Sequence, residues 1–242
     1  MELDLPFAIA HRGARGTAPE NTRAAAIKAR ELGCRWIEVD VQLTADRVPV
    51  VIHDHTLERT TNGHGPVAAA TAAQLSALDA GRWFAPTFSG EPIPTLARMV
   101  QTCQDLDLGL NIELKPATGA DVQTARAVAA TIKSTKQPVL VSSFSHAALG
   151  AFHASAPDIP LGAVYRAAPR DADLRRLGVP VHSIHVASSA LTRADVERLT
   201  AAGFRVLSYT VNDAGRGRQL SSWGVTAVFT DYPERFIGLI AA

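Results

Sequence analysis

The feature that most constrains the fold is a regular alternation of short β-rich runs and longer helical runs in the second half of the chain. A parallel strand pair needs a crossover of about a dozen residues or more, so this alternation predicts a parallel sheet with helices between its strands. The strands are expected at Leu108–Leu114, Val139–Ser143, Leu161–Tyr165, Val181–Val186, Arg205–Val211 and Ala227–Thr230. The helices are expected at Asp121–Ser134, His146–Ser155, Asp171–Leu177, Arg193–Ala202, Ala214–Trp223 and Glu234–Ile240.

Two strands and two helices precede this region. The strands are expected at Phe7–Ala10 and Cys34–Val41, and the helices at Pro19–Glu31 and from Thr95 onward. Eight strands alternating with eight helices in 242 residues match the size of a (β/α)8 TIM barrel, an α/β fold; a doubly wound open sheet is the alternative. Residues 44–94 interrupt the alternation, and we expect them to form a small insertion after strand two, within a single domain of residues 1–242.

The composition argues against several classes of partner. A net charge of +1 with no cluster of Lys and Arg does not suit a nucleic-acid surface. No apolar run approaches the roughly 20 residues of a membrane helix, and the N-terminus does not resemble a secretory signal. The two cysteines, Cys34 and Cys103, lie in apolar surroundings, so we expect buried free thiols. These features predict a cytoplasmic protein without stable membrane insertion.

The stretch Trp36–Asp54 is expected to fold as a β-hairpin. Glu38 and Asp40 alternate with apolar residues, which in a strand places both carboxylates on one face. Val48–Ile52 is again β-rich, and the connection between the two runs is too short for a parallel crossover. An antiparallel return, with its turn near Asp46-Arg47, would bring His53 close to Asp40.

Three carboxylates are expected to meet at the carboxyl ends of the barrel strands, where TIM-barrel active sites lie. Glu113 follows a later strand and would join Glu38 and Asp40. Three unpaired negative charges cannot stay close together in a low-dielectric interior. Oxygen ligands without cysteine suit a hard divalent cation, Mg²⁺ or Ca²⁺. The alternative is a buried salt-bridge cluster in which Arg12 and Lys115 neutralise the acids.

Two histidines at the same mouth suggest proton transfer. His11 ends the first strand and His53 ends the hairpin, so they suit a general acid and a general base, with metal ligation as a competing role. Arg12 and Lys115 would favour an anionic substrate, most simply a phosphate ester. For His185, contact with substrate and a structural role are equally compatible with the sequence.

Beside these residues, a set of motifs resembles the glycerophosphodiester phosphodiesterase family, in its compact cytoplasmic bacterial type. The motifs are H-R-G at 11–13, P-E-N-T at 19–22, E-V-D at 38–40, H-D at 53–54, T-L-E-R-T-T-N-G at 56–63, E-L-K at 113–115, S-S-F at 142–144, Y-T-V-N at 209–212 and T-D-Y-P at 230–233. Each motif is weakly specific alone, whereas their order and spacing together are highly specific. One position departs from the family pattern, because the hairpin turn is Asp46-Arg47 where Asp-Gly is common.

The resemblance implies a TIM barrel with an insertion after strand two and one divalent metal ion, Mg²⁺ or Ca²⁺. It implies metal ligands at Glu38, Asp40 and Glu113, and an acid/base pair at His11 and His53. It also implies phosphate contacts from Arg12 and Lys115 and a position near the site for Glu20.

The expected activity is metal-dependent hydrolysis of small glycerophosphodiesters, such as glycerophosphocholine or glycerophosphoethanolamine, to sn-glycerol 3-phosphate and an alcohol. A lysophospholipase D-type phosphodiesterase on the same barrel and a catalytically silent phosphodiester-binding protein are the alternatives. The sequence leaves open which histidine is the acid, whether water attacks directly or a cyclic phosphate forms first, and the oligomeric state.

Overall fold

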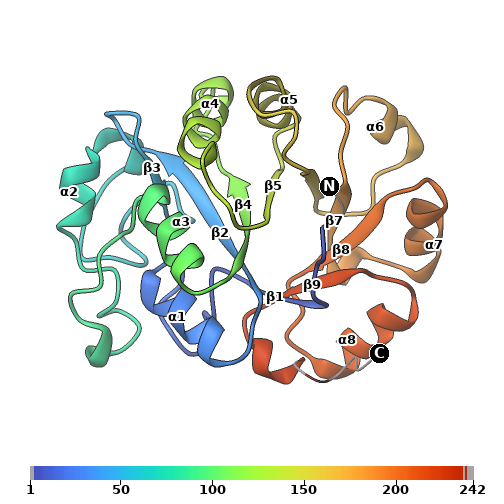
Figure 1. The fold of residues 1–242 in the computed structure, drawn as a ribbon, viewed down its shortest axis with the longest axis horizontal. Coiled ribbons are helices and arrows are strands. Elements are labelled where there is room, and N and C mark those ends of the chain that lie inside the picture. The colour runs from blue at the N-terminus through green and yellow to red at the C-terminus, as the bar shows by residue number, and fades with distance from the viewer. Residues whose placement is uncertain (1–2, 237, 239–242) are drawn as a thin grey trace.

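Eight parallel strands close into a ring in the structure, a computed structural model that describes residues 3–236 and 238 (Figure 1). The ring closes because β1 pairs with β9 on one side and with β2 on the other. The expected TIM barrel is confirmed. The ring strands are β1 (Ala8–Ala10), β2 (Trp36–Leu43), β4 (Gly109–Leu114), β5 (Val139–Ser143), β6 (Leu161–Tyr165), β7 (Ser183–Ala187), β8 (Arg205–Tyr209) and β9 (Ala227–Thr230).

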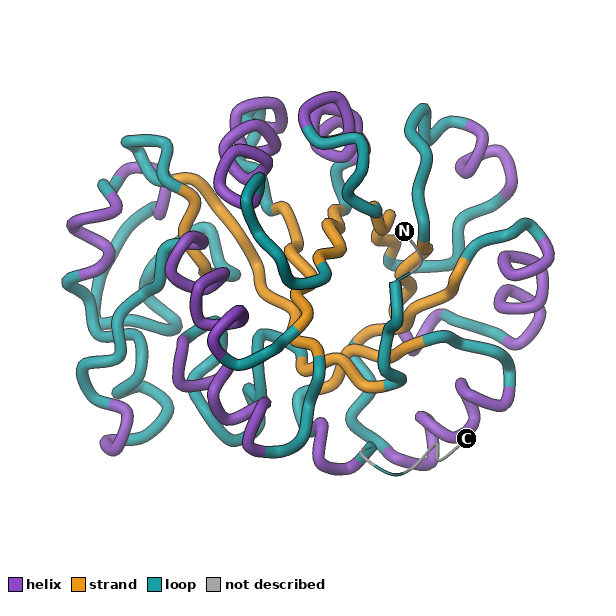
Figure 2. Tube along the Cα trace, viewed as in Figure 1, coloured by secondary structure: helices purple, strands orange, loops and turns teal. Residues whose placement is uncertain are grey.

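Helices surround the ring on its outside (Figure 2). They are α1 (Arg23–Glu31), α3 (Leu96–Asp105), α4 (Asp121–Ile132), α5 (His146–Ser155), α6 (Asp171–Arg175), α7 (Arg193–Ala201) and α8 (Ala214–Ser222). Within the part of the chain that the structure describes, none of the helices combines the length and apolar character needed to cross a membrane.

The prediction of a helix over Glu234–Ile240 is wrong at its first residues. Pro233–Arg235 form a 3-10 turn, and residues 237 and 239–242 lie outside the described residues. Proline suits the first position of such a turn, because its missing N–H would have no partner there.

The expected hairpin is confirmed. Strand β3 (Pro49–Val51) runs antiparallel to β2, with Val41 opposite Val51. The turn lies where the sequence predicts it, and Arg47 there adopts a left-handed φ of 62°. Strand β3 is not part of the ring; it lies against its outside and carries the chain toward His53 (Figure 1).

The segment that follows β3 has an apolar cluster of its own. It contains the short helix α2 (Ala72–Ser76) and the 3-10 turns η1 (Val67–Ala69) and η2 (Pro86–Phe88). The buried side chains that form the cluster are Val50, Ile52, Leu57, Val67, Leu75, Ala80 and Ile93. Since Val50 and Ile52 flank Val51 of β3, this cluster anchors the return arm that ends at His53.

The pleat of β2 decides which side chains face the barrel interior. Ile37, Val39 and Val41 point outward and join the core between the ring and the helices. Trp36 points inward and packs in a smaller apolar cluster with residues such as Ile9 and Leu140. Glu38 and Asp40 share the inward face with Trp36, one and two pleats further along the strand, and are likewise buried.

Gly109 on the neighbouring strand β4 makes room for Trp36. A Cβ atom at position 109 would lie 2.3 Å from the indole ring, so only glycine fits beside it.

Burial of both cysteines predicts unreactive thiols in the native protein. Burial raises the pKa of Cys34 and of Cys103 to about 12, and the thiolate is the reactive species. We expect alkylation by iodoacetamide at pH 8 to be about 100-fold or more slower than in protein unfolded by guanidinium, where two thiols should react. Rapid labelling of the native protein at either position would contradict the buried placement.

Candidate active site

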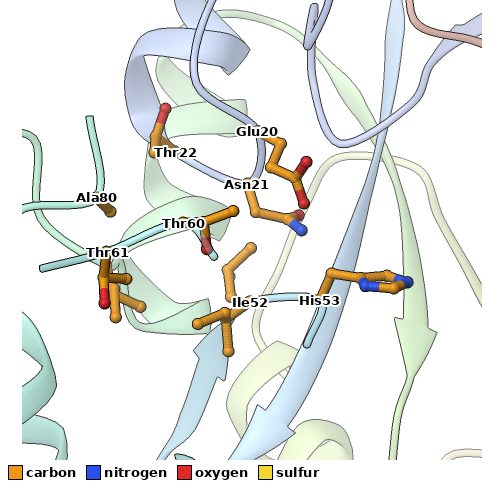
Figure 3. Close-up of a pocket in the computed structure, with 10 residues that line it drawn as sticks. Glu20, Asn21, Thr22, Ile52, His53, Thr60, Thr61 and Ala80 are labelled. Atoms are coloured by element: carbon orange, nitrogen blue, oxygen red, sulfur yellow. The ribbon is translucent and has the colours of Figure 1, made fainter. Parts of the chain in front are cut away.

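The carboxyl ends of the ring strands surround a cleft of about 760 Å³. Most residues singled out in the sequence line it: His11, Arg12, Asp40, His53, Glu113 and Lys115. Glu38 lies deeper, in a small cavity below that it shares with His11, Glu113 and His185. Glu20, an ion-pair partner of Arg12, lines a separate small cavity (Figure 3). The fold therefore gathers these residues around one end of the barrel.

Glu38, Asp40 and Glu113 form the centre of the site. One carboxylate oxygen from each lies within 4.8 Å of the others. The arrangement follows from strand pairing, because Asp40 on β2 is opposite Glu113 on β4. Burial, followed by the charges of Asp40 and Glu113, raises the pKa of Glu38 well above its usual value.

The same carboxylates fit a metal ion. Oxygen Oε1 of Glu38 is buried and has no hydrogen-bond partner among the described residues, although a buried carboxylate oxygen normally has one. Oxygen Oε1 of Glu113 is likewise buried without a hydrogen-bond partner among these residues, although Lys115 Nζ lies 3.0 Å away. Three carboxylates with two such oxygens match the ligands preferred by Mg²⁺ and Ca²⁺.

Two cations and an amide hold Asp40 in its ionised form. Arg12 Nε lies 3.1 Å and Lys115 Nζ 3.3 Å from its carboxylate oxygens, and Asn21 Nδ2 donates a hydrogen bond of 2.8 Å. Burial alone would raise the pKa of Asp40, but Arg12 and Lys115 outweigh it and lower the pKa to about 2. Lys115 also lies 3.0 Å from Glu113, so it bridges two of the three acids.

His11 is held by a carboxylate from the opposite end of the sequence. Its Nδ1 donates to Asp231 Oδ1 at 2.7 Å, and Asn212 donates to the other oxygen of Asp231. With Nδ1 engaged, Nε2 faces the acids, 4.0 Å from Glu38. The hydrogen bond to Asp231 raises the pKa of His11, but burial lowers it by more, so the neutral ring is favoured.

His53 has an equivalent arrangement on the other side of the cleft. Its Nδ1 donates to Asp54 Oδ1 at 2.6 Å. Asp54 in turn accepts a hydrogen bond from Arg59. The hydrogen bonds from Arg59 and His53 hold the pKa of the Asp54 carboxyl below its ordinary value. Burial lowers the pKa of His53 as well. Each histidine therefore has its own aspartate at Nδ1.

Glu20 joins the two halves of the site. Arg59 donates to both of its oxygens, at 3.0 and 2.7 Å, while Arg12 donates to one of them at 2.7 Å. Although burial opposes ionisation, hydrogen bonds from Arg59 and the charge of Arg12 lower the pKa of Glu20 to about 2. Figure 3 shows Glu20, Asn21 and His53 pointing to one side, away from Thr61. A direct contact between Glu20 and substrate stays a prediction, because the described contacts of its carboxylate are to arginines.

His185 lies on the floor of the small cavity. Its Nε2 contacts the Ser183 hydroxyl at 2.9 Å, and its ring lies 5.2 Å from that of Phe229. Burial, followed by the charge of His182, lowers the pKa of His185 to about 3, so its ring is neutral. Its contact with substrate also stays a prediction.

The sequence analysis missed the partners that orient the catalytic candidates. These are Asn21, Asp54, Arg59 and Asp231. For Asp54 a signal was present, because it directly follows His53. Asp231 lies in the T-D-Y-P motif at 230–233, but nothing in the local sequence pairs it with a histidine 220 positions away.

Replacing Glu38 by Gln should stabilise the protein in metal-free buffer. A carboxyl with a raised folded pKa destabilises the fold above its unfolded pKa, so the penalty is absent at pH below about 4.5 and grows above it. Glutamine removes the charge and keeps an acceptor for the Arg12 N–H. We expect the free energy of unfolding at pH 8 to rise by about 1–2 kcal/mol, or the melting temperature by roughly 3–6 °C.

Asp40→Asn is the matched control. Because the folded pKa of Asp40 is lowered, its charge stabilises the fold above pH ~3.9, and its removal should lower the melting temperature at pH 8. Thermal unfolding of both variants with chelator measures the two effects. A lower melting temperature for Glu38→Gln would contradict the repulsion described for the carboxylates.

Comparisons with known proteins identify the family to which the chain belongs. Residues 11–235 match the model of the glycerophosphoryl diester phosphodiesterase family. A glycerophosphodiester phosphodiesterase of Caldanaerobacter subterraneus is 35% identical over 236 residues, 96% of each chain. A solved phosphodiesterase of Oleispira antarctica, in complex with the product sn-glycerol-3-phosphate, superposes with a TM-score of 0.94 at 37% identity, covering 98% of both chains.

A second solved structure extends the likeness. The glycerophosphodiester phosphodiesterase of Agrobacterium tumefaciens has a TM-score of 0.82 at 30% identity, covering 97% of this chain and 100% of its own. The resemblance inferred from the motifs is confirmed: the chain belongs to the glycerophosphoryl diester phosphodiesterase family.

Proposed function

We propose that the protein catalyses the metal-dependent hydrolysis of glycerophosphodiesters to sn-glycerol 3-phosphate and an alcohol. The observation that carries the proposal is the convergence of three carboxylates and two aspartate-held histidines at one end of the barrel, in the cleft and the small cavity below it. The product bound to the similar Oleispira antarctica enzyme supports the class of substrate.

Glu38, Asp40 and Glu113 would hold one divalent cation, Mg²⁺ or Ca²⁺. When bound, such a cation supplies a Lewis acid that polarises a phosphoryl oxygen. The unsatisfied oxygen of Glu38 and the burial of Glu38 and Asp40 support this assignment, and Glu113 is partly buried beside them.

Arg12 and Lys115 would orient the phosphate and offset its negative charge. Both cations line the cleft beside Asp40, and both are fixed by carboxylates before substrate arrives. Donors that are already oriented lose little entropy on binding and stabilise charge that develops during reaction.

His11 and His53 would divide the proton transfers. Neutral Nε2 of one histidine accepts a proton from the nucleophile, and the other histidine, in its protonated form, gives a proton to the leaving alkoxide. The aspartate at each Nδ1 fixes the tautomer and stabilises the imidazolium form. The proposal does not assign which histidine is the base.

We also propose a cytoplasmic setting, supported by the free thiols at Cys34 and Cys103, which suit a reducing compartment.

Removal of divalent metal should abolish turnover. After treatment with EDTA and metal-free exchange, we expect release of glycerol 3-phosphate to fall by at least about 100-fold, since polarisation of the phosphoryl oxygen is worth several kcal/mol. Addition of Mg²⁺ or Ca²⁺ should restore it, and the ion that restores the higher rate identifies the preferred metal. Full activity after thorough chelation would refute the metal assignment.

Substitution of either histidine should lower kcat strongly. His11→Asn and His53→Asn should each reduce kcat by about 10²–10⁴-fold, the usual contribution of a general acid or base. His64→Asn, in the exposed part of the insertion, is a control that should retain normal kcat.

A diester with an activated leaving group separates the two roles. A p-nitrophenyl glycerophosphate needs little protonation of its leaving group, so it should restore most of the rate in the variant that lacks the acid. The variant that lacks the base should stay slow. Near-normal kcat for either variant on an unactivated diester would remove that histidine from the proton-transfer pair.

A further inference from the structure

One wall of the cleft is aromatic and carries a cation. Phe144 follows β5 and Tyr209 ends β8, and their rings meet edge-to-face with centroids 6.1 Å apart. The guanidinium of Arg166, just after β6, lies over the Phe144 ring, 5.5 Å from its centroid. Phe144 is 42% exposed, so its ring is accessible from the cleft. All three residues line the same cleft as Glu113 and Lys115.

Tyr209 connects this wall to the reaction centre. It lines both the cleft and the small cavity that contains His11, Glu38 and Glu113. Its hydroxyl donates to the backbone carbonyl of Tyr165 at 2.9 Å, which fixes the ring. A substrate whose phosphate lies at the carboxylates can therefore extend along Tyr209 and Phe144 to Arg166.

Arg166 differs from the other cations of the cleft. Arg12 and Lys115 each lie within 3.3 Å of carboxylate oxygens. Among residues 3–236 and 238, no carboxylate lies within ion-pair distance of Arg166, whose described partner is the Phe144 ring. Asp121 also lines the cleft, but its carboxylate accepts a hydrogen bond from Ser145. Among the described residues of the cleft, Arg166 is thus a cation that no carboxylate pairs with directly.

We propose that Arg166 binds an anionic group, a carboxylate or a phosphate, on the alcohol moiety of the diester. The inference rests on the proposed function and adds a substrate class: glycerophosphodiesters whose alcohol carries a negative charge. The planar guanidinium suits bidentate contact with such a group, and its position over Phe144 orients it before binding.

The same geometry disfavours a quaternary ammonium group. An aromatic ring attracts a cation at its face, but the face of Phe144 already carries the Arg166 guanidinium. A choline group placed there would meet a like charge. Choline recognition on this face of Phe144 is therefore disfavoured by the charge of Arg166.

Glycerophosphoserine and glycerophosphoethanolamine form a matched pair of probes, because they differ by one carboxylate on the alcohol. The measurement is the ratio of kcat/KM for the serine diester to that for the ethanolamine diester, with metal-loaded enzyme. Arg166→Met should lower this ratio about five-fold, as expected for one partly exposed ion pair. Arg166→Glu should lower it further, and high salt should shrink the ratio of the wild-type enzyme.

Arg218→Met is the matched control, since Arg218 is exposed on α8 and does not line the cleft. It should leave the ratio unchanged. Equal ratios in the wild type, Arg166→Met and Arg166→Glu, with normal turnover of the ethanolamine diester, would overturn the assignment of Arg166 alone. If the wild-type enzyme released no glycerol 3-phosphate from either diester, the proposed function itself would fail, and the two failures are distinguishable.

Discussion

The repulsion among Glu38, Asp40 and Glu113 is the constraint around which the rest of the site is arranged. Closure of the ring places these acids close together, with Glu38 and Asp40 buried and Glu113 partly buried. Each negative charge there raises the free energy needed to ionise the neighbouring carboxyl group. Arg12 and Lys115 offset part of this repulsion at Asp40. At Glu38 the repulsion is not fully offset, and its Oε1 has no hydrogen-bond partner among the described residues. A fold selected for stability alone would not keep this arrangement, because an apolar side chain at position 38 would avoid the penalty. The cost is understandable if a cation belongs there.

Around this centre the charged groups form one connected network. Glu20 holds Arg12 and Arg59, Arg59 holds Asp54, and Asp54 holds His53. Glu20 therefore supports the orientation of His53, through Arg59 and Asp54, and also positions Arg12 beside Asp40. His11 joins the same network through Asp231, because Arg15 lies 3.6 Å from Asp231 and 3.5 Å from Glu20. Both histidines are therefore connected through their aspartates and an arginine to Glu20.

The features that depend only on residues close together in the sequence were predicted correctly. Alternation of residue type along β2 determined that Glu38 and Asp40 face inward, and the short connection at Asp46-Arg47 required a hairpin. Contacts that depend on packing between distant segments were not predictable in this way. Asp231 meets His11 only because β9 closes the ring against β1, and Arg59 reaches Glu20 only because the insertion folds back over the loop before α1. Such pairs have no periodic or adjacent signal in the sequence.

Strand β3 lies outside the ring, and this has a consequence for how the protein can change. The ring supplies the acids and His11, whereas a surface segment with an apolar cluster of its own supplies His53. Surface segments accept substitutions and insertions more readily than barrel strands do. The two parts can therefore diverge at different speeds. Changes within residues 44–94 would reach the segment that supplies His53 while the ring strands that supply the carboxylates kept their sequence.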